Sequence, residues 1–289
     1  MKVLVTGSEG MLGQALMKVL PEAGFEVEGT DIRSDKNRAD ITSDSQIISL
    51  INQQKPDIVI HAAAFTDVDA SEQDPAKASY VNGIGTKNVA VGCKESDAFC
   101  VYISTDFIFD GNRTIPYTEK DLTGPLNAYG RSKLEGENFI SEILTRSLII
   151  RSSWLFGEGG KNFVDTIINK AIEEKYLRVV DDQRGSPTYT MDLAHAIVRV
   201  LPQDRESITK TLHISNSGFC TWFEFAREIL DVKALKDGVL EAAASSEIGS
   251  LAIRPKMSIL DNSKLKSLYG DIMPSWQDAL RRYITREER

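Results

Sequence analysis

Short β-branched runs alternate with longer amphipathic stretches through the first half of the chain. This alternation is typical of strand–helix–strand units, because polarity repeats about every second residue in a half-buried strand and about every 3.6 residues in a helix. The predicted strands are 2–6, 25–30, 58–61, 99–104 and 147–153. The predicted helices between them are 11–20, 45–54, 75–96 and 134–144. This order predicts an α/β fold with a doubly wound parallel sheet covered by helices on both faces.

The pattern loosens after Trp154, where glycine and proline interrupt it. The elements expected there are helices at 162–174, 191–201, 221–231 and 275–284, and strands at 178–180 and 211–214. We therefore predict a sheet domain of residues 1–155, to which about 186–214 return, and a smaller α/β lobe of about 156–185 and 215–289. A cleft between two such lobes is a natural binding place for a cofactor together with a second substrate.

The charge balance bears on possible partners. Acidic residues outnumber basic ones by 42 to 34, which gives a net charge of −8, and no basic run is longer than two residues. Nucleic acid is therefore not an expected partner, since its binders carry basic faces. No stretch is apolar and long enough for a membrane span or a signal peptide, so we expect no membrane contact and a cytosolic location.

Cysteine and histidine give no sign of a metal site. The three cysteines are odd in number and lack a C-x-x-C spacing, which favours buried small hydrophobic residues. They are Cys93, Cys100 and Cys220. The three histidines have no partner at a spacing typical of metal ligands or of a Ser-His-Asp arrangement, so we expect structural roles for them. They are His61, His195 and His213.

A glycine run follows the first predicted strand and opens the first predicted helix. Its sequence is Gly7-Ser8-Glu9-Gly10-Met11-Leu12-Gly13. Glycine permits a tight turn and lets backbone N–H groups approach a pyrophosphate, while a helix N-terminus offers it partial positive charge. The run predicts that the sheet domain is an NAD(P)-binding Rossmann domain, with Gly7, Gly10, Met11, Leu12 and Gly13 at the cofactor.

The end of the second predicted strand bears on which cofactor is bound. Asp31 follows this strand, where a carboxylate can bond both ribose hydroxyls of the adenosine half, which favours NADH. Arg33 stands two residues later, where a guanidinium could accept the 2′-phosphate of NADPH. The choice between NADPH and NADH therefore stays open.

Tyr129 and Lys133 form a Y-x-x-x-K spacing at the start of a predicted helix. Four residues make about one helical turn, so both side chains lie on one face. An ammonium close to a phenol favours the phenolate, so we expect Lys133 to lower the pKa of Tyr129 toward neutral pH. A phenol tuned in this way can serve as a general acid or base.

Hydroxyl side chains mark the end of the predicted strand 99–104. Ser104, Thr105 and Asp106 lie where ligands sit in open α/β sheets. The chain resembles the short-chain dehydrogenase/reductase superfamily in its extended form, because a hydroxyl residue, Tyr129 and Lys133 follow the N-terminal glycine run in this order. The resemblance covers essentially the whole chain.

Further local runs narrow this resemblance to the dTDP-4-dehydrorhamnose reductase family. They are 61–69 (HAAAFTDVD), 104–111 (STDFIFDG), 125–130 (PLNAYG), 182–188 (DQRGSPT), and Arg254-Pro255 with Leu260-Asp261. The resemblance implies NAD(P)H-dependent reduction of the C4 ketone of dTDP-4-dehydro-L-rhamnose to dTDP-L-rhamnose, a step in polysaccharide biosynthesis. It also implies further cofactor contacts at Asp40, Ile41, Ala62, Ala63, Ala64 and Thr66.

Catalytic roles carry over residue by residue from the resemblance. Thr105 would bond the substrate oxygen, Tyr129 would donate the proton, and Lys133 would hold the nicotinamide ribose and tune Tyr129. The resemblance gives this role to Thr105 rather than Ser104 because the family motif ends Ser-Thr-Asp, and alternation on a strand also points the two to opposite faces. Nucleotide-sugar 4,6-dehydratases of the superfamily have Thr-Asp-Glu here, whereas Phe107 follows Asp106 in this chain, which favours plain ketone reduction.

The same resemblance implies a site for the nucleotide sugar. Its residues would be Thr105, Asp106, Phe107, Trp154, Asn162 and Arg184, with Lys161 as a further candidate for the diphosphate. Trp154 could stack on the deoxysugar ring or fill the core between the lobes. The helix 221–231 would pack in the second lobe or form the face of a possible homodimer.

Two other functions fit the same residues. A reductase or epimerase that acts on another nucleotide sugar would keep every cofactor residue and the Thr-Tyr-Lys set. A non-catalytic regulatory subunit is the second alternative, since the beta subunit of methionine adenosyltransferase resembles the same reductases and binds NADP as a partner protein. Consumption of NAD(P)H by the purified chain distinguishes an enzyme from such a subunit.

Overall fold

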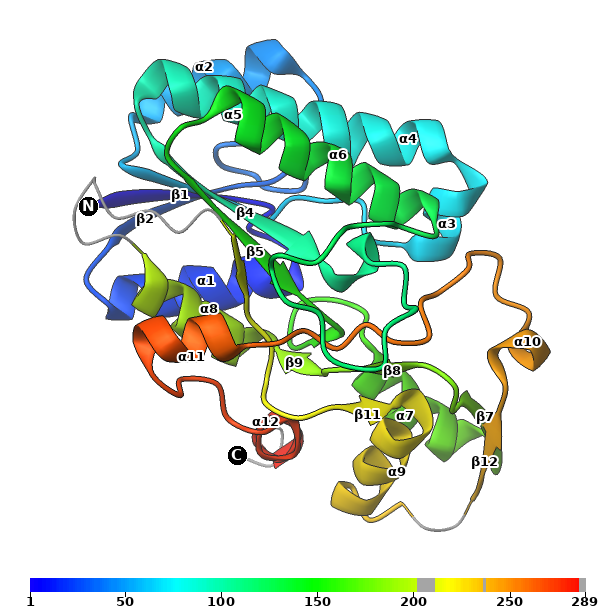
Figure 1. Ribbon diagram of the computed structural model, residues 1–289. Coiled ribbons are helices and arrows are strands. Elements are labelled where there is room, and N and C mark those ends of the chain that lie inside the picture. The colour runs from blue at the N-terminus through cyan, green and yellow to red at the C-terminus, as the bar shows by residue number, and fades with distance from the viewer. Residues whose placement is uncertain (202–210, 236–237, 286–289) are drawn as a thin grey trace.

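The computed structural model describes residues 1–201, 211–235 and 238–285. Within these residues, six parallel strands form one central sheet (Figure 1). In spatial order they are β10 (Thr211–His213), β5 (Ser147–Ser152), β4 (Phe99–Thr105), β3 (Ile58–His61), β1 (Lys2–Thr6) and β2 (Glu26–Thr30). The chain order reverses between β1 and β3, and a crevice at such a switch point is where open α/β sheets bind ligands. The predicted fold class is confirmed.

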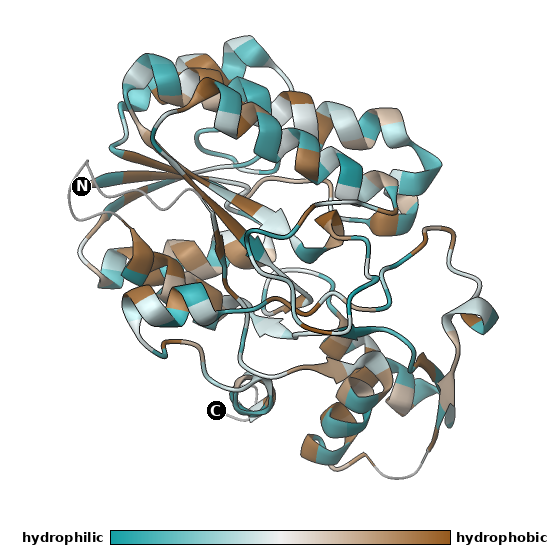
Figure 2. Ribbon diagram, in the orientation of Figure 1, coloured by the Kyte–Doolittle hydropathy of each residue, from teal (hydrophilic) through white to brown (hydrophobic). Residues whose placement is uncertain are grey.

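Helices cover both faces of the sheet (Figure 1). One face carries α2 (Asp44–Gln54), α5 (Gly85–Ser96) and α6 (Ala128–Ile143), and the other carries α1 (Met11–Glu22), α8 (Thr190–Val200) and α11 (Ser263–Tyr269). Figure 2 shows hydrophobic residues gathered on the central strands, between the two helical layers. Burial of these strands on both faces explains why they read as nearly continuous apolar runs.

The chain between β3 and β4 differs from the single helix predicted at 75–96. It forms α3 (Val68–Gln73), α4 (Pro75–Ser79), a π-helical turn (Tyr80–Ile84) and then α5. The side chain of Asp67 caps α3 and that of Asp74 caps α4. Two such caps so close together produce short helices, and α3 had no counterpart in the prediction.

Helix α6 begins at Ala128, not at the predicted Leu134. The side chain of Asn127 accepts a hydrogen bond of 2.8 Å from the N–H of Gly130 and so caps the helix. Before α6, residues Asp106–Ile108 make a short 3₁₀ turn. Tyr129 therefore lies in the first turn of α6, close to the end of β4.

The smaller lobe is built from short strand pairs and three longer helices. Its elements are β6 (Leu155–Phe156), α7 (Phe163–Glu173), β7 (Tyr176–Val180), β8 (Arg184–Gly185), β9 (Thr188–Tyr189), β11 (Cys220–Thr221), α9 (Trp222–Val232), β12 (Val239–Ala243), α10 (Ser245–Ile248) and α12 (Trp276–Thr285). β7 pairs with β12, β8 with β11, and β6 with β9. Phe156, Phe225 and Tyr283 are central in its core.

Several segments of the second half pack on the main sheet. β10 adds a strand beside β5, and α8 packs on α1. Leu265 of α11 and Met273 also belong to the core of the sheet, although the predicted division assigned 215–289 to the lobe. The division itself stays a prediction. Among the helices of the described residues, none has the length and apolar character that crossing a lipid bilayer requires.

Candidate active site

The glycine run forms the turn between β1 and α1. Gly7 has φ +71°, and a Cβ atom there would lie 2.5 Å from the backbone nitrogen of Ala63. A Cβ atom on Gly13 would lie 2.0 Å from the carbonyl oxygen of Gly7. These two glycines therefore serve the packing of the turn, since any side chain would displace the backbone.

Gly10 is different, because its side of the turn is open. It is the N-cap residue of α1, and a Cβ atom there would meet nothing nearer than the Gly7 carbonyl oxygen, at 3.3 Å. No side chain caps α1. The first N–H groups of a helix have no carbonyl partner within it, so those of Met11 and Leu12 are suited to an anion.

Asp31 follows β2 beside this turn. It is largely buried, and its Oδ2 accepts a hydrogen bond of 3.3 Å from the N–H of Glu9. Its Oδ1 accepts bonds from the backbone N–H of Arg33 at 2.9 Å and from Nε of the same residue at 3.2 Å. The carboxylate and the exposed guanidinium thus form an ion pair next to the glycine run.

The other predicted cofactor residues lie in two loops. Ala62, Ala63, Ala64 and Thr66 follow β3, where Ala62 and Ala63 lie against Gly7. Asp40 and Ile41 lie in the loop before α2. There Asp40 accepts hydrogen bonds from Thr42, and the Ile41 carbonyl accepts one from Asn88. The roles of these residues toward a cofactor stay predictions.

Thr105, the last residue of β4, lies next to Tyr129. Its Oγ1 donates to Asp106 at 3.1 Å and accepts from the N–H of Phe107 at 3.2 Å. The phenol of Tyr129 lies within hydrogen-bonding reach of Thr105, and its ring contacts that of Phe107 edge-on, 6.0 Å between centroids. A Cβ atom on Gly130 would lie 2.1 Å from the Phe107 carbonyl oxygen, so glycine allows α6 to approach this closely.

Burial controls the acidity of this cluster. It raises the pKa of Tyr129 to about 12, although the hydrogen bond with Thr105 acts the other way, and the charge of Asp106 raises it further. Burial also raises the pKa of the Asp106 carboxyl to about 7, against the effect of hydrogen bonds from Ser258 and Thr105. Tyr129 is therefore a protonated phenol at neutral pH.

Lys133 does not act on Tyr129 as predicted. Its Nζ donates a hydrogen bond of 2.7 Å to the carbonyl oxygen of Ile103 and lies 4.2 Å from the centre of the Tyr102 ring. Burial lowers the pKa of Lys133 to about 7, while the charge of Glu137 acts to raise it. The predicted fall in the pKa of Tyr129 is wrong for this state of the protein, because the ammonium points into the sheet and the phenol is desolvated.

Ser104 serves the opposite face of β4. Its hydroxyl donates to the carboxylate of Glu137, which also receives two hydrogen bonds from Arg151, at 3.0 and 2.7 Å. All three side chains are buried. The prediction from sequence missed Glu137 and Arg151. A signal was present, since Glu137 stands one turn after Lys133 and Arg151 interrupts an apolar strand.

Trp154 is half-buried and packs against the core of the small lobe. Its ring stacks on that of Trp222, with centroids 3.4 Å apart and planes 4° apart, and a Cβ atom on Gly185 would lie 2.3 to 2.6 Å from three adjoining atoms of its ring. A position at similar distances from three adjoining ring atoms lies above the plane of the ring. Gly185 therefore covers one face of the Trp154 ring, and Trp222 covers the other. This geometry favours the core role over stacking on a sugar ring, for which Trp222 would have to move.

Asn162 and Arg184 have different surroundings. The Oδ1 of Asn162 caps α7 by accepting from the N–H of Asp165, and its Nδ2 donates to the Gly157 carbonyl and the Tyr283 hydroxyl. This buried amide is thus engaged by the lobe itself. Arg184 is exposed on β8, with a side chain suited to an anion. Their contacts with a substrate stay predictions.

Two of the three histidines are buried and neutral. Burial lowers the pKa values of His61 and His213 to about 3. The ring of His61 bonds Thr6 and Thr86, at 2.7 and 3.0 Å. His195 is exposed on α8. Within the described residues, no group of three or more His, Cys, Asp and Glu side chains is placed to hold a metal ion.

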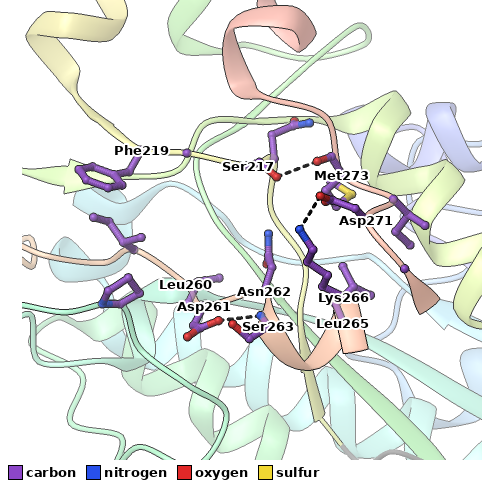
Figure 3. Close-up of a pocket in the computed structure, with 16 residues that line it drawn as sticks. Ser217, Phe219, Leu260, Asp261, Asn262, Ser263, Leu265, Lys266, Asp271 and Met273 are labelled. Carbon is purple, nitrogen blue, oxygen red and sulfur yellow. Dashed lines mark hydrogen bonds and ion pairs between the residues drawn. The ribbon is translucent and has the colours of Figure 1, made fainter. Parts of the chain in front are cut away.

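A surface cavity of about 480 Å³ has a lining that does not include the catalytic residues (Figure 3). It opens between the loop 216–219, the segment 259–263 and the turn 270–273. Lys266 and Asp271 form an ion pair of 2.6 Å at its side. None of the predicted site residues lines it, so the candidate active site is defined by the cluster at the end of β4 instead.

Comparisons with known proteins agree with this geometry. The sequence matches the family model described as "RmlD substrate binding domain" over residues 1–289. It is 40% identical to "Spore coat polysaccharide biosynthesis protein SpsK" of Bacillus subtilis, over 98% of this chain and 96% of that protein. It is 36% identical to a dTDP-4-dehydrorhamnose reductase of Aggregatibacter actinomycetemcomitans, over 97% of each. The fold is similar to that of dTDP-4-dehydrorhamnose reductase from Bacillus anthracis in complex with NADP, with a TM-score of 0.92, 38% identity and 99% of each chain covered.

Proposed function

We infer the function from the premise that this chain belongs to the RmlD substrate binding domain family. It is an NAD(P)H-dependent dTDP-4-dehydrorhamnose reductase, which reduces the C4 ketone of dTDP-4-dehydro-L-rhamnose to dTDP-L-rhamnose. The observation that carries this conclusion is the cluster of Thr105, Tyr129 and Lys133 at the end of β4, beside a glycine turn. The product is a sugar donor for polysaccharide biosynthesis, in keeping with the name of the Bacillus subtilis relative.

The residues of the glycine turn fit a dinucleotide. The space on the outer side of Gly10, which a side chain would fill, suits a pyrophosphate against the N–H groups of Met11 and Leu12. Asp31 would hold the adenosine ribose, and Arg33 would meet a 2′-phosphate. When bound, the cofactor supplies the hydride that reduces the ketone. The protein supplies the binding, the proton and the stabilisation of charge.

Proton donation falls to Tyr129. Hydride addition to the ketone leaves negative charge on its oxygen, and an alkoxide is a far stronger base than a phenolate, so the proton moves favourably from phenol to oxygen. The raised pKa of Tyr129, about 12, supports this role because it keeps the donor protonated at neutral pH. Thr105 would donate a second hydrogen bond to the same oxygen.

Lys133 would hold the nicotinamide ribose and stabilise the phenolate that remains after proton transfer. Lys133 is buried and stands one helical turn after Tyr129 on α6, although its ammonium is bonded to the Ile103 carbonyl in this structure and would have to turn toward the phenol. Asp106, Phe107, Asn162 and Arg184 are proposed to contact the nucleotide sugar, whereas Trp154, which stacks on Trp222, is assigned to the core. Of these, Arg184 would contact the diphosphate, because it is the exposed cation of the set.

A direct assay distinguishes this function from its alternatives. The purified chain is mixed with NADPH or NADH and enzymatically prepared dTDP-4-dehydro-L-rhamnose, and absorbance at the nicotinamide band is followed. We expect oxidation of the cofactor and formation of dTDP-L-rhamnose, with its C4 configuration identified by NMR. Turnover only with another 4-keto nucleotide sugar would favour the alternative substrate. Cofactor binding without turnover of any of them would favour the regulatory subunit.

Location and assembly are further proposals. We propose that the enzyme acts in the cytosol, where NAD(P)H and nucleotide sugars are available, and that it forms a homodimer. Light scattering coupled to size-exclusion chromatography tests the second proposal. A mass close to 32.0 kDa would identify a monomer and contradict it.

A further inference from the structure

A segment of the small lobe crosses to the sheet domain next to the catalytic helix. Residues 251–254, which we call the clasp, run beside α3 in the chain between α10 and α11 (Figure 1). The N–H of Ala252 donates to Oδ1 of Asp69 at 2.9 Å. The guanidinium of Arg254 donates to the same carboxylate twice, from Nη1 to Oδ1 at 3.2 Å and from Nη2 to Oδ2 at 2.8 Å.

The clasp also reaches the catalytic helix directly, through Asn127. The Nδ2 of this residue donates to the carbonyl oxygen of Ile253 at 2.8 Å, while its Oδ1 accepts from the N–H of Gly130 at 2.8 Å. Asn127 is 0% exposed, so water cannot easily replace either bond. A single buried amide thus connects the clasp to the first turn of α6, which carries Tyr129.

Helix α3 provides a second connection. Asp69, which receives the clasp, and Glu72 lie about one turn apart on α3. The Oε2 of Glu72 accepts a hydrogen bond of 2.7 Å from the N–H of Ala128, the residue before Tyr129. Movement of α3 would therefore change the support of the catalytic turn from the other side.

The geometry of the pair of Asp69 and Arg254 makes it more specific than an ordinary surface contact. Their side chains are 40% and 22% exposed, and isolated pairs at such exposure contribute little. Here, however, the guanidinium binds both oxygens, and a backbone N–H shares one of them. The hydrogen bond from Arg254 lowers the pKa of Asp69, so both groups are charged at neutral pH.

We propose that Asp69, Arg254 and Asn127 are positioning residues: the clasp holds the small lobe against α3 and thereby fixes Tyr129 relative to Thr105. None of the three lies on the elements proposed to hold the pyrophosphate and the adenosine ribose, because the glycine turn and Asp31 belong to β1, α1 and β2. Loss of the clasp should therefore reduce kcat and raise the KM for the sugar, and leave cofactor affinity unchanged. This proposal rests on the proposed function for its kinetic readout.

The test uses a double-mutant cycle on the full-length enzyme. Arg254→Met keeps the apolar stem and removes the charge, Asp69→Asn keeps an acceptor for Ala252, and the double variant combines both. Arg281→Met is the matched control, because it removes an exposed ion pair of 3.1 Å with Glu228, which joins α12 to α9 within the small lobe. Arg254→Lys serves if the methionine variant does not fold, since it keeps the charge but not the paired hydrogen bonds.

We expect Arg254→Met to lower kcat about tenfold, with the NADPH Kd within about twofold of the wild-type value. The double variant should be no slower than Arg254→Met, because both changes break one interaction. A loss no greater than that in Arg281→Met, or losses that multiply in the double variant, would overturn the proposal. So would a lower melting temperature with unchanged kcat, since that result marks a purely structural role.

Hydrogen exchange separates failure of the clasp from failure of the proposed function. Amides of residues 128–131 should exchange faster in Arg254→Met than in the wild type, even if the protein turns over no nucleotide sugar. Unchanged exchange at 128–131 would overturn the proposal whatever the activity of the wild-type protein.

Discussion

Lys133 is held by Ile103: its Nζ donates a hydrogen bond of 2.7 Å to the carbonyl oxygen of that residue, in the strand that ends in Thr105. The ammonium also lies over the Tyr102 ring. It is thus stabilised by a carbonyl dipole and an aromatic face, and the charge of Glu137 acts in the same direction. These interactions compensate burial only in part, and the pKa of Lys133 falls to about 7.

The first prediction concerns pH. Only protonated Lys133 carries the positive charge that stabilises a phenolate, and its charge-assisted hydrogen bonds to a ribose are stronger than those of the neutral amine. Because its pKa is lowered to about 7, kcat/KM for NADPH should fall as pH rises through about 7. A profile flat to pH 9 would contradict this prediction. Lys133→Met should abolish this fall of kcat/KM with rising pH, and it should lower the rate and weaken cofactor binding at every pH.

The second prediction concerns the pyrophosphate. Gly10→Val should weaken NADPH binding by at least about tenfold, because its side chain would fill the space in front of the first N–H groups of α1. The new Cβ would meet only the Gly7 carbonyl oxygen, at 3.3 Å, so the apoprotein should still fold, which its melting temperature checks. Fluorescence titration measures the affinity, and Gly10→Ala should have a smaller effect. An unchanged Kd in the valine variant would exclude this position for the phosphates.

The third prediction concerns cofactor selectivity. Asp31→Ala should shift the ratio of kcat/KM values toward NADPH by roughly tenfold, because it removes a carboxylate near the 2′-phosphate and releases the guanidinium of Arg33. Arg33→Met should shift the ratio toward NADH. If neither variant changes the ratio, this ion pair does not lie at the adenosine ribose.

The sequence predicted the sheet well because its central strands are buried on both faces. Apolar runs such as Val3–Val5 and 58–60 are favourable in a folded chain only when they are buried in its core, and glycine marks the turn that follows β1. The hydrophobic pattern by contrast placed the start of α6 at Leu134, because Asn127, Tyr129 and Gly130 are weak helix formers, and only the spacing of Tyr129 and Lys133 indicated the earlier turn. The cap that allows this turn to form depends on contacts with residues distant in sequence, Ile253 and Glu72.

The candidate site shows the same limit. The spacing of Tyr129 and Lys133 predicts their common face, but not where a long lysine stem directs its charge. Glu137 and Arg151 form their buried pair only when α6 packs on β5. The stack of Trp154 on Trp222 likewise joins elements that are far apart in the chain. Local pattern identifies the chemistry, whereas tertiary packing decides burial and pKa.

The most direct test of the account is the rate of cofactor oxidation by Tyr129→Phe with dTDP-4-dehydro-L-rhamnose. The change keeps the ring, and with it the contact to Phe107, and deletes only the hydroxyl. Because general acid catalysis contributes about a hundredfold to ten-thousandfold, kcat should fall within that range. NADPH affinity should be unchanged. A Tyr129→Phe enzyme that reduces this substrate at the wild-type rate would contradict the mechanism.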